Sequence, residues 1–233
     1  MDDFINTIGA DEVGVGDYFG GIVTCAVFLD EQICSEIIDL PIKDSKKLSI
    51  STTIKLAKTL IKKVIYEVCV VSPKQYNFLY SKFHNSHVIK TYAHNEAIYH
   101  LQQKLNKNLQ YVTILDQYAN KTHYDTYLNT LNPKYLAKID IFIPKAESKY
   151  LAVACASIIA RYYFLKQIKT LSLQVGVILP LGFNQQAIDE AINQLHAKYE
   201  TNWNEMAYDI LKLHFKYTNQ TTKEGKTKDE KSI

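Results

Sequence analysis

The amino-acid sequence predicts an α/β fold, in which a sheet is covered by helices and followed by a helical C-terminal part. Three observations lead to this class. Short β-branched runs alternate with longer segments whose apolar residues recur at helical spacing. Two of the short runs end close to a proline, which is typical of strands that stop. The last helical patterns follow one another without a strand pattern between them.

The first two strands are expected on either side of a glycine-rich turn. Residues 4–12 begin one strand, and the β-branched run 22–29 forms the second. Residues 50–63 then repeat apolar positions at helical spacing, with Ser49 or Ser51 as a suitable N-cap.

Strands and helices alternate through the rest of the chain. The run 64–71 is β-branched and ends before Pro73, which favours a buried strand. Two short apolar strands are expected at 111–115, which stops at Asp116, and at 138–143, which stops at Pro144. The remaining segments with helical spacing are 86–106, 148–171, 184–199 and 203–214.

The composition is that of a globular protein with a polar end. Of the 233 residues, 47% are apolar and 22% are charged, as in ordinary folded domains. The stretch 218–233 is polar and cannot bury enough surface to offset the entropy of ordering it. We expect one catalytic domain over 1–217 and a disordered polar tail over 218–233.

Several features predict a monomeric protein of the cytoplasm. No apolar run approaches the roughly 20 residues that a membrane span needs, and the acidic start Met1-Asp2-Asp3 is unlike a signal peptide. The four cysteines lie far apart without a C-x-x-C pair, so we interpret them as reduced thiols. The net charge of +3 is weak evidence for a nucleic-acid partner.

The most informative segment is GADEVGVGDYFGG, which runs from Gly9 to Gly21. It holds five of the eight glycines of the chain, beside Asp11, Glu12 and Asp17. Glycine is needed where φ is positive or where another group approaches the backbone closely. A tight hairpin also needs glycine, but one or two would suffice, so the cluster favours a functional site.

A nucleotide-binding loop is the first alternative for this segment. Gly14, Gly16 and Gly20 come near the spacing of a dinucleotide fingerprint, but that motif must open a helix, and 22–28 is predicted to be a strand. Three carboxylates at the loop would also repel a pyrophosphate. They are explained if a cation binds between them.

Further carboxylates follow two other predicted strands, where open α/β sheets place their ligands. Asp116 ends one strand and Glu147 lies just past another, although a turn or a first helical turn would explain either alone. With Asp11 and Glu12 they give four carboxylates from three segments, as a two-metal phosphodiester hydrolase needs. Successive strand residues point to opposite faces, so we expect the strand to bend or end at Asp11 and Glu12.

An ordered series of motifs extends over nearly the whole predicted domain. The blocks are TIGADEVGVGDYFGG from Thr7, DSKKLS from Asp44, PKQYN from Pro73, HNEA from His94, LDQY from Leu115, KAES from Lys145, ACASIIAR from Ala154 and LPLG from Leu179. This series resembles ribonuclease HIII, within the type 2 ribonuclease H family.

The resemblance implies a ribonuclease H-like mixed sheet flanked by helices. It also implies endonucleolytic hydrolysis of the RNA strand of RNA/DNA hybrids, leaving 5′-phosphate and 3′-hydroxyl ends. By position, it implies that Mg²⁺ or Mn²⁺ is bound by the catalytic carboxylates Asp11, Glu12, Asp116 and Glu147.

Selectivity for RNA requires contact with the 2′-hydroxyl group, which DNA lacks. We predict this contact at the backbone around the glycines, because they leave room for a sugar. Tyr18 could stack on a sugar or base, or be a core residue, and a solvated turn is the alternative for 45–47. The candidate substrate-binding residues are Val13, Gly14, Val15, Gly16, Asp17, Tyr18, Ser45, Lys46 and Lys47.

Two other functions stay open at this point. One is cleavage at single ribonucleotides in duplex DNA, as in ribonuclease HII, and the other is a binding module without catalysis. Val15 stands where the resembled branch usually has threonine, and the usual N-terminal substrate-binding domain is not expected, because the first motif begins at Thr7. The four intact carboxylates argue against a non-catalytic module.

Four histidines raise the alternative of a zinc site. His84, His87, His94 and His100 fall in a predicted helical stretch, but their spacing is irregular and no cysteine completes a ligand set. We interpret them as core or surface histidines.

Overall fold

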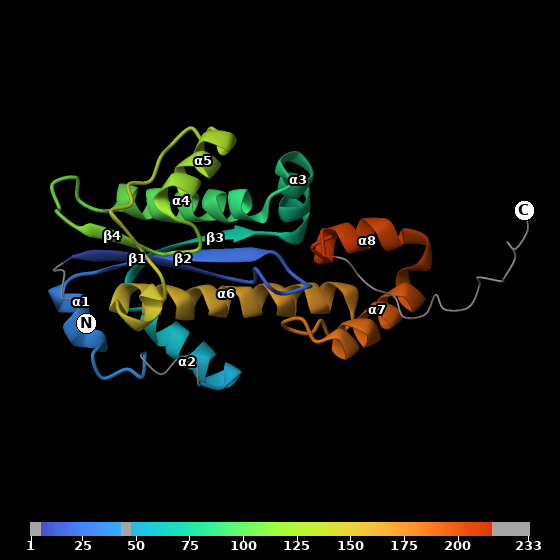
Figure 1. Ribbon diagram of the computed structural model, residues 1–233. Helices are drawn as coiled ribbons and strands as arrows, with labels where there is room; N and C mark the ends of the chain where they lie inside the picture. The colour runs from blue at the N-terminus through green and yellow to red at the C-terminus, as the bar shows by residue number, and fades with distance from the viewer. Residues whose placement is uncertain (1–5, 43–47, 216–233) are drawn as a thin grey trace, which may run out of the picture.

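The computed structural model describes residues 6–42 and 48–215. A five-stranded sheet lies between two layers of helices, and further helices lie beyond one end of the sheet (Figure 1). The helices above the sheet in this view are α3 (Pro73–Phe83), α4 (Ser86–Lys104) and α5 (Lys121–Leu131); those below are α1 (Glu31–Ile37), α2 (Ile50–Leu60) and α6 (Leu151–Val175). The predicted fold class is confirmed.

The sheet is mixed: one side of it pairs antiparallel and the other side pairs parallel. Its strands are β1 (Thr7–Val13), β2 (Ile22–Leu29), β3 (Ile65–Val71), β4 (Val112–Asp116) and β5 (Ile141–Ile143). The order is β3-β2-β1-β4-β5, in which β1, β2 and β3 are antiparallel and β4 and β5 continue parallel to β1. The central strand β1 therefore ends beside β4, and its C-terminal end meets the C-terminal end of β4.

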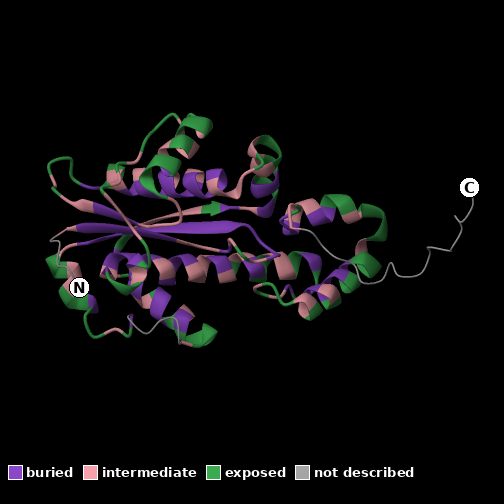
Figure 2. Ribbon diagram, viewed as in Figure 1, coloured by how far each residue is buried: buried purple, intermediate pink, exposed green. Residues whose placement is uncertain are grey.

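Helix α6 forms the main core with the sheet (Figure 2). It packs lengthwise on β1 and β2, and Gly9 allows this close approach, because a Cβ atom there would collide with the backbone of Val153. Among the described helices, α6 is the one long and apolar enough to cross a membrane. Its most apolar 18-residue stretch has a mean hydropathy of 1.2, but 56% of that stretch is buried inside the protein. This burial is what a core helix requires.

The described helices include three that the sequence reasoning did not predict. They are α1, α3 and α5, and each begins at a side-chain cap. Helix α3 has the clearest signal, a capping box in which Ser72 and Gln75 bond each other's backbone, followed by proline at the first helical position. In the sequence, Pro73 indicated the end of a strand and the start of the PKQYN motif, but not the start of a helix. Helix α2 was predicted, and Ser49 is its N-cap as expected.

The prediction of a buried strand at 64–71 was wrong. β3 is an edge strand, and Ile65 and Val70 are exposed on it. The β-branched composition indicated the strand but not its place in the sheet. All four cysteines are free, and Cys25 and Cys155 are buried.

Two helices, α7 (Gln185–Tyr199) and α8 (Trp203–Ile210), form the C-terminal part beyond the end of the sheet (Figure 1). The predicted tail over 218–233 and the candidates Ser45, Lys46 and Lys47 lie outside the described residues.

Candidate active site

The parallel pairing of β1 with β4 brings two of the predicted carboxylates together. Ala10 is in register with Leu115, so Asp11 and Asp116 are the next residues on neighbouring strands. Both lie on the sheet face that α6 covers, because Gly9 and Ile114, two residues earlier on each strand, meet Val153 of α6.

Asp11 lies in a buried, crowded position. Its side chain is near Ser157 of α6, and its Oδ1 accepts a hydrogen bond from the Glu12 backbone N–H at 2.8 Å. Burial raises the pKa of Asp11 to about 7, and the charges of Glu12 and Asp116 add to this, while the hydrogen bonds from Ser157 and from the Glu12 N–H oppose it. A nearby cation would relieve both the burial cost and the repulsion.

A short 3-10 helix, η2 (Ala146–Ser148), brings the fourth carboxylate to Asp116. The Ala146 N–H donates to Asp116 Oδ1 at 2.9 Å, and Glu147 is the next residue. Burial raises the pKa of Asp116, and the neighbouring charges of Glu147 and Glu12 raise it further, although the bond from Ala146 opposes this. Asp116 therefore stands between Asp11 on one side and Glu147 on the other.

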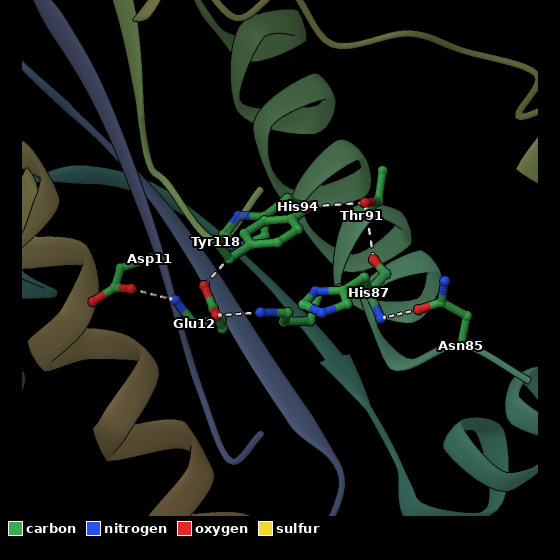
Figure 3. A network of polar contacts seen from close by, with 8 residues as sticks. Asp11, Glu12, Asn85, His87, Thr91, His94 and Tyr118 are labelled. Carbon is green, nitrogen blue, oxygen red and sulfur yellow. Dashed lines mark hydrogen bonds and ion pairs between the residues drawn. The ribbon is translucent and has the colours of Figure 1, made fainter. Parts of the chain in front are cut away.

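Glu12 points to the opposite face of the sheet, toward α4 (Figure 3). The strand stays in regular pairing with β2 through Glu12 and ends one residue later at Val13, so it does not bend at Asp11 and Glu12 but ends just after them. Glu12 Oε2 lies 2.9 Å from His94 Nε2, and Oε1 lies 3.4 Å from Lys90 Nζ. Burial alone would raise the pKa of Glu12, but the contacts with His94 and Lys90 outweigh it and lower the pKa.

The partners of Glu12 are functional candidates that the sequence reasoning missed. His94 is fully buried, which agrees with a core histidine, and its ring stacks on Tyr118 at 5.4 Å. Lys90 Nζ lies 4.1 Å from the centre of the same ring. A usable signal was present, since Lys90 and His94 are polar residues four apart on a helix whose neighbouring positions are largely buried.

Four of the five clustered glycines have structural reasons. Gly14 has φ +99° and packs against Phe164, and Gly20 has φ +82° and packs against Ile168. Gly9 and Gly21 are each pressed against neighbouring backbone. Only Gly16 faces open space, with nothing within 4 Å of the place of a Cβ atom. We predicted that the glycines leave room for a ribose. Within the cluster, only Gly16 has such room.

The residues after Gly16 connect the loop to the C-terminal part. Asp17 Oδ1 accepts from the Gly182 N–H at 2.6 Å, and the Asp17 carbonyl accepts from Lys212 Nζ at 2.6 Å. Lys212 is fully buried, and burial lowers its pKa to about 7, which the charge of Asp17 opposes. Asp17 and Lys212 thus hold the loop in place.

Tyr18 and Val15 are packing residues in this structure. Tyr18 is only 5% exposed, and its ring packs edge-on against Phe19 and Phe183, which is the packing that the core alternative predicts. The Val15 side chain is partly buried against the cluster that contains Ile22 and Val71. Its backbone stays in the turn before Gly16.

The donor set suits a hard divalent cation. The four predicted side chains offer only carboxylate oxygens, the ligands that Mg²⁺ and Mn²⁺ take. Asp11 and Asp116 also carry raised pKa values that a cation would lower. Among the described residues, however, no three His, Cys, Asp or Glu side chains are already grouped closely enough to hold one ion. Glu12, turned to α4, is the member that stands apart.

Comparison with known proteins gives a consistent result. The family model described as ribonuclease HII matches residues 8–218. Curated relatives named ribonuclease HIII include those of Phytoplasma mali, 39% identical over 91% of this chain and 70% of the relative, and Lactococcus lactis, 34% identical over 94% and 73%.

Solved structures agree with these relatives. The crystal structure of Bst-RNase HIII in complex with Mn²⁺ is 33% identical, with a TM-score of 0.84 over 91% of this chain and 67% of that one. The structure of Aquifex aeolicus RNase H3 is 27% identical, with a TM-score of 0.67 over 89% and 71%. The chain thus spans about two thirds to three quarters of the relatives it matches.

Proposed function

Because this chain belongs to the ribonuclease HII family, where its curated relatives are named ribonuclease HIII, we propose that it cuts the RNA strand of RNA/DNA hybrids. Ribonuclease H activity itself follows from the family. The observation that carries the finer proposal is that Asp11 and Asp116 lie side by side on β1 and β4, with Glu147 of η2 next to Asp116. The expected products carry 5′-phosphate and 3′-hydroxyl ends.

We propose that Asp11, Glu12, Asp116 and Glu147 hold the catalytic divalent cations, Mg²⁺ or Mn²⁺. When bound, such cations supply an activated water and stabilise the charge of the leaving 3′-oxygen. Two of these ligands, Asp11 and Asp116, are oriented by hydrogen bonds within the protein. The Ser157 side chain and the Glu12 N–H orient Asp11, and the Ala146 N–H orients Asp116. Their burial strengthens electrostatic interactions within the site.

Recognition of the ribose is assigned to the backbone of residues 13–16. The open space at Gly16 supports this proposal, since a sugar could approach the chain there without meeting a side chain. The bonds of Asp17 to Gly182 and Lys212 keep this backbone fixed. Val15 contributes its backbone, because its side chain packs against the protein.

We also propose that residues 1–217 form the catalytic domain and that the protein acts as a cytoplasmic monomer. The family match over 8–218 supports the domain bounds.

A comparison of two substrates tests the proposed specificity against the ribonuclease HII-like alternative. With Mn²⁺ or Mg²⁺, a long RNA/DNA hybrid should be cut at least about tenfold faster than a DNA duplex that contains one ribonucleotide. The reason is that a continuous RNA strand offers 2′-hydroxyls all along the loop at 13–16. Initial rates on labelled substrates measure the ratio. Efficient cutting on the 5′ side of the lone ribonucleotide would show the alternative specificity, and binding of both without cutting would show a non-catalytic module.

A further inference from the structure

Glu12 has a lysine and a histidine of helix α4 beside its carboxylate. Its side chain is 13% exposed, and those of its partners Lys90 and His94 are 7% and 0% exposed. The contacts of 3.4 Å to Lys90 Nζ and 2.9 Å to His94 Nε2 involve both carboxylate oxygens. Glu12 is therefore held on the α4 side of the sheet (Figure 3).

His94 bonds Glu12 through one of its two ring nitrogens. His94 Nδ1 is buried, and no hydrogen-bond partner for it is present in the described part of the chain. The tautomer with its proton on Nδ1 would bury that proton without a partner and leave Nε2 with none to donate, so the tautomer with a proton on Nε2 fits the 2.9 Å contact with Glu12. His94 thus orients the carboxylate.

Lys90 places an ammonium group beside the same carboxylate. Its Nζ is fixed above the Tyr118 ring at 4.1 Å, and the Tyr118 hydroxyl is in turn bonded to the Thr91 hydroxyl at 2.7 Å. The other ionisable groups that act on this region from β1 and β4 are the carboxyl groups of Asp11 and Asp116. His87, one turn before Thr91 on α4, also faces Lys90 and Glu12.

We infer that the Lys90 ammonium competes with a divalent cation for Glu12 and so sets how tightly the site binds metal. This inference rests on the proposed function, because it takes Glu12 to be a metal ligand. A cation that approaches Glu12 must displace the ion pair with Lys90, and it is also repelled by the ammonium in a poorly hydrated site. Lys90 is thus a positioning residue, which holds the Glu12 carboxylate on the α4 side of the sheet.

Metal binding without nucleic acid tests the inference. We expect Lys90→Gln and Lys90→Met to bind Mn²⁺ about tenfold more tightly than the wild type, because one opposing charge is removed near a divalent ion. Lys90→Arg, which keeps the charge, should stay within about threefold of the wild type. Isothermal titration and the electron paramagnetic resonance of free Mn²⁺ give the affinity and the stoichiometry. Unchanged or weaker binding in both neutral variants would overturn the inference.

Two further variants make the test specific. Lys104→Gln removes an exposed lysine from the far end of the same helix and should leave Mn²⁺ affinity unchanged. In a Glu12→Gln background, Lys90→Gln should no longer tighten binding by the full factor, since the contested carboxylate is gone. Circular dichroism confirms that each variant is folded, and Lys90→Gln keeps a hydrogen-bond donor for Glu12 if Lys90→Met does not fold.

Failure of the inference about Lys90 can be told apart from failure of the proposed function. If the wild type cuts hybrids but neutral Lys90 variants bind Mn²⁺ no more tightly, the function stands and the inference fails. If the variants bind more tightly but the wild type leaves hybrids intact, the competition is real and the proposed function is wrong.

Discussion

Asp11→Asn should lower the rate of hybrid cleavage by about a thousandfold or more while leaving the protein folded. The substitution keeps the size and the hydrogen-bonding shape of the side chain but removes the negative charge between the Glu12 N–H and Asp116. A cation held by carboxylates is bound less tightly and less precisely when one of them is neutral. Single-turnover cleavage of a labelled hybrid at saturating Mn²⁺ gives the rate.

The same variant should not be less stable than the wild type. Burial and neighbouring carboxylates already raise the pKa of Asp11 to about 7, so the charged form is disfavoured in the folded protein without metal. Thermal unfolding in a chelator at pH 8 checks this, and Asp39→Asn, at an exposed position, is the matched control. Cleavage by Asp11→Asn at the wild-type rate would remove this residue from the catalytic site.

Gly9→Ala should destabilise the protein by about 3 kcal/mol or prevent folding. The added Cβ atom would meet the backbone of Val153 and Ala152 in α6, and backbone atoms cannot turn aside as a side chain can. The strand that carries Asp11 would have to separate from the helix that carries Ser157. Urea unfolding followed by circular dichroism measures the loss.

Gly16→Ala is the matched control for that prediction. A Cβ atom at Gly16 meets nothing within 4 Å, so the free energy of unfolding should change by less than about 0.5 kcal/mol. Equal stabilities for the two variants would contradict the assigned packing of β1 on α6.

The parts of the fold that depend on local pattern could be predicted from the sequence. The run 22–29 was predicted as a strand with the bounds that the structure gives it, because β-branched and apolar residues dominate it. This composition matches its place in the sheet, where all of its residues are buried. Predicted strand 138–143 was too long. Lys138 bonds Gln102 through its backbone, and Asp140 accepts from the Thr113 N–H, so regular pairing with β4 begins only at Ile141.

The site also has parts that could be predicted from the sequence and parts that could not. The convergence of Asp11 with Asp116 could be expected from carboxylates at the ends of strands, since parallel neighbours end at one edge. The contacts of Lys90 and His94 with Glu12 could not be predicted, because they depend on which face of α4 packs against the side of the sheet to which Glu12 points. The glycine cluster misled in part, since close packing at Gly9 and Gly21 leaves the same signature as access for a ligand.

The end chemistry of hybrid cleavage tests the central claim most directly. The protein should be incubated with an RNA/DNA hybrid whose RNA strand is labelled at either end, with Mn²⁺ and, separately, with a chelator. Internal cuts confined to the RNA strand, with 5′-phosphate and 3′-hydroxyl ends and only in the presence of the cation, are the predicted result. An intact RNA strand at every Mn²⁺ concentration, or cuts in the chelator that leave 2′,3′-cyclic phosphate ends, would contradict a carboxylate-held metal site built on Asp11 and Asp116.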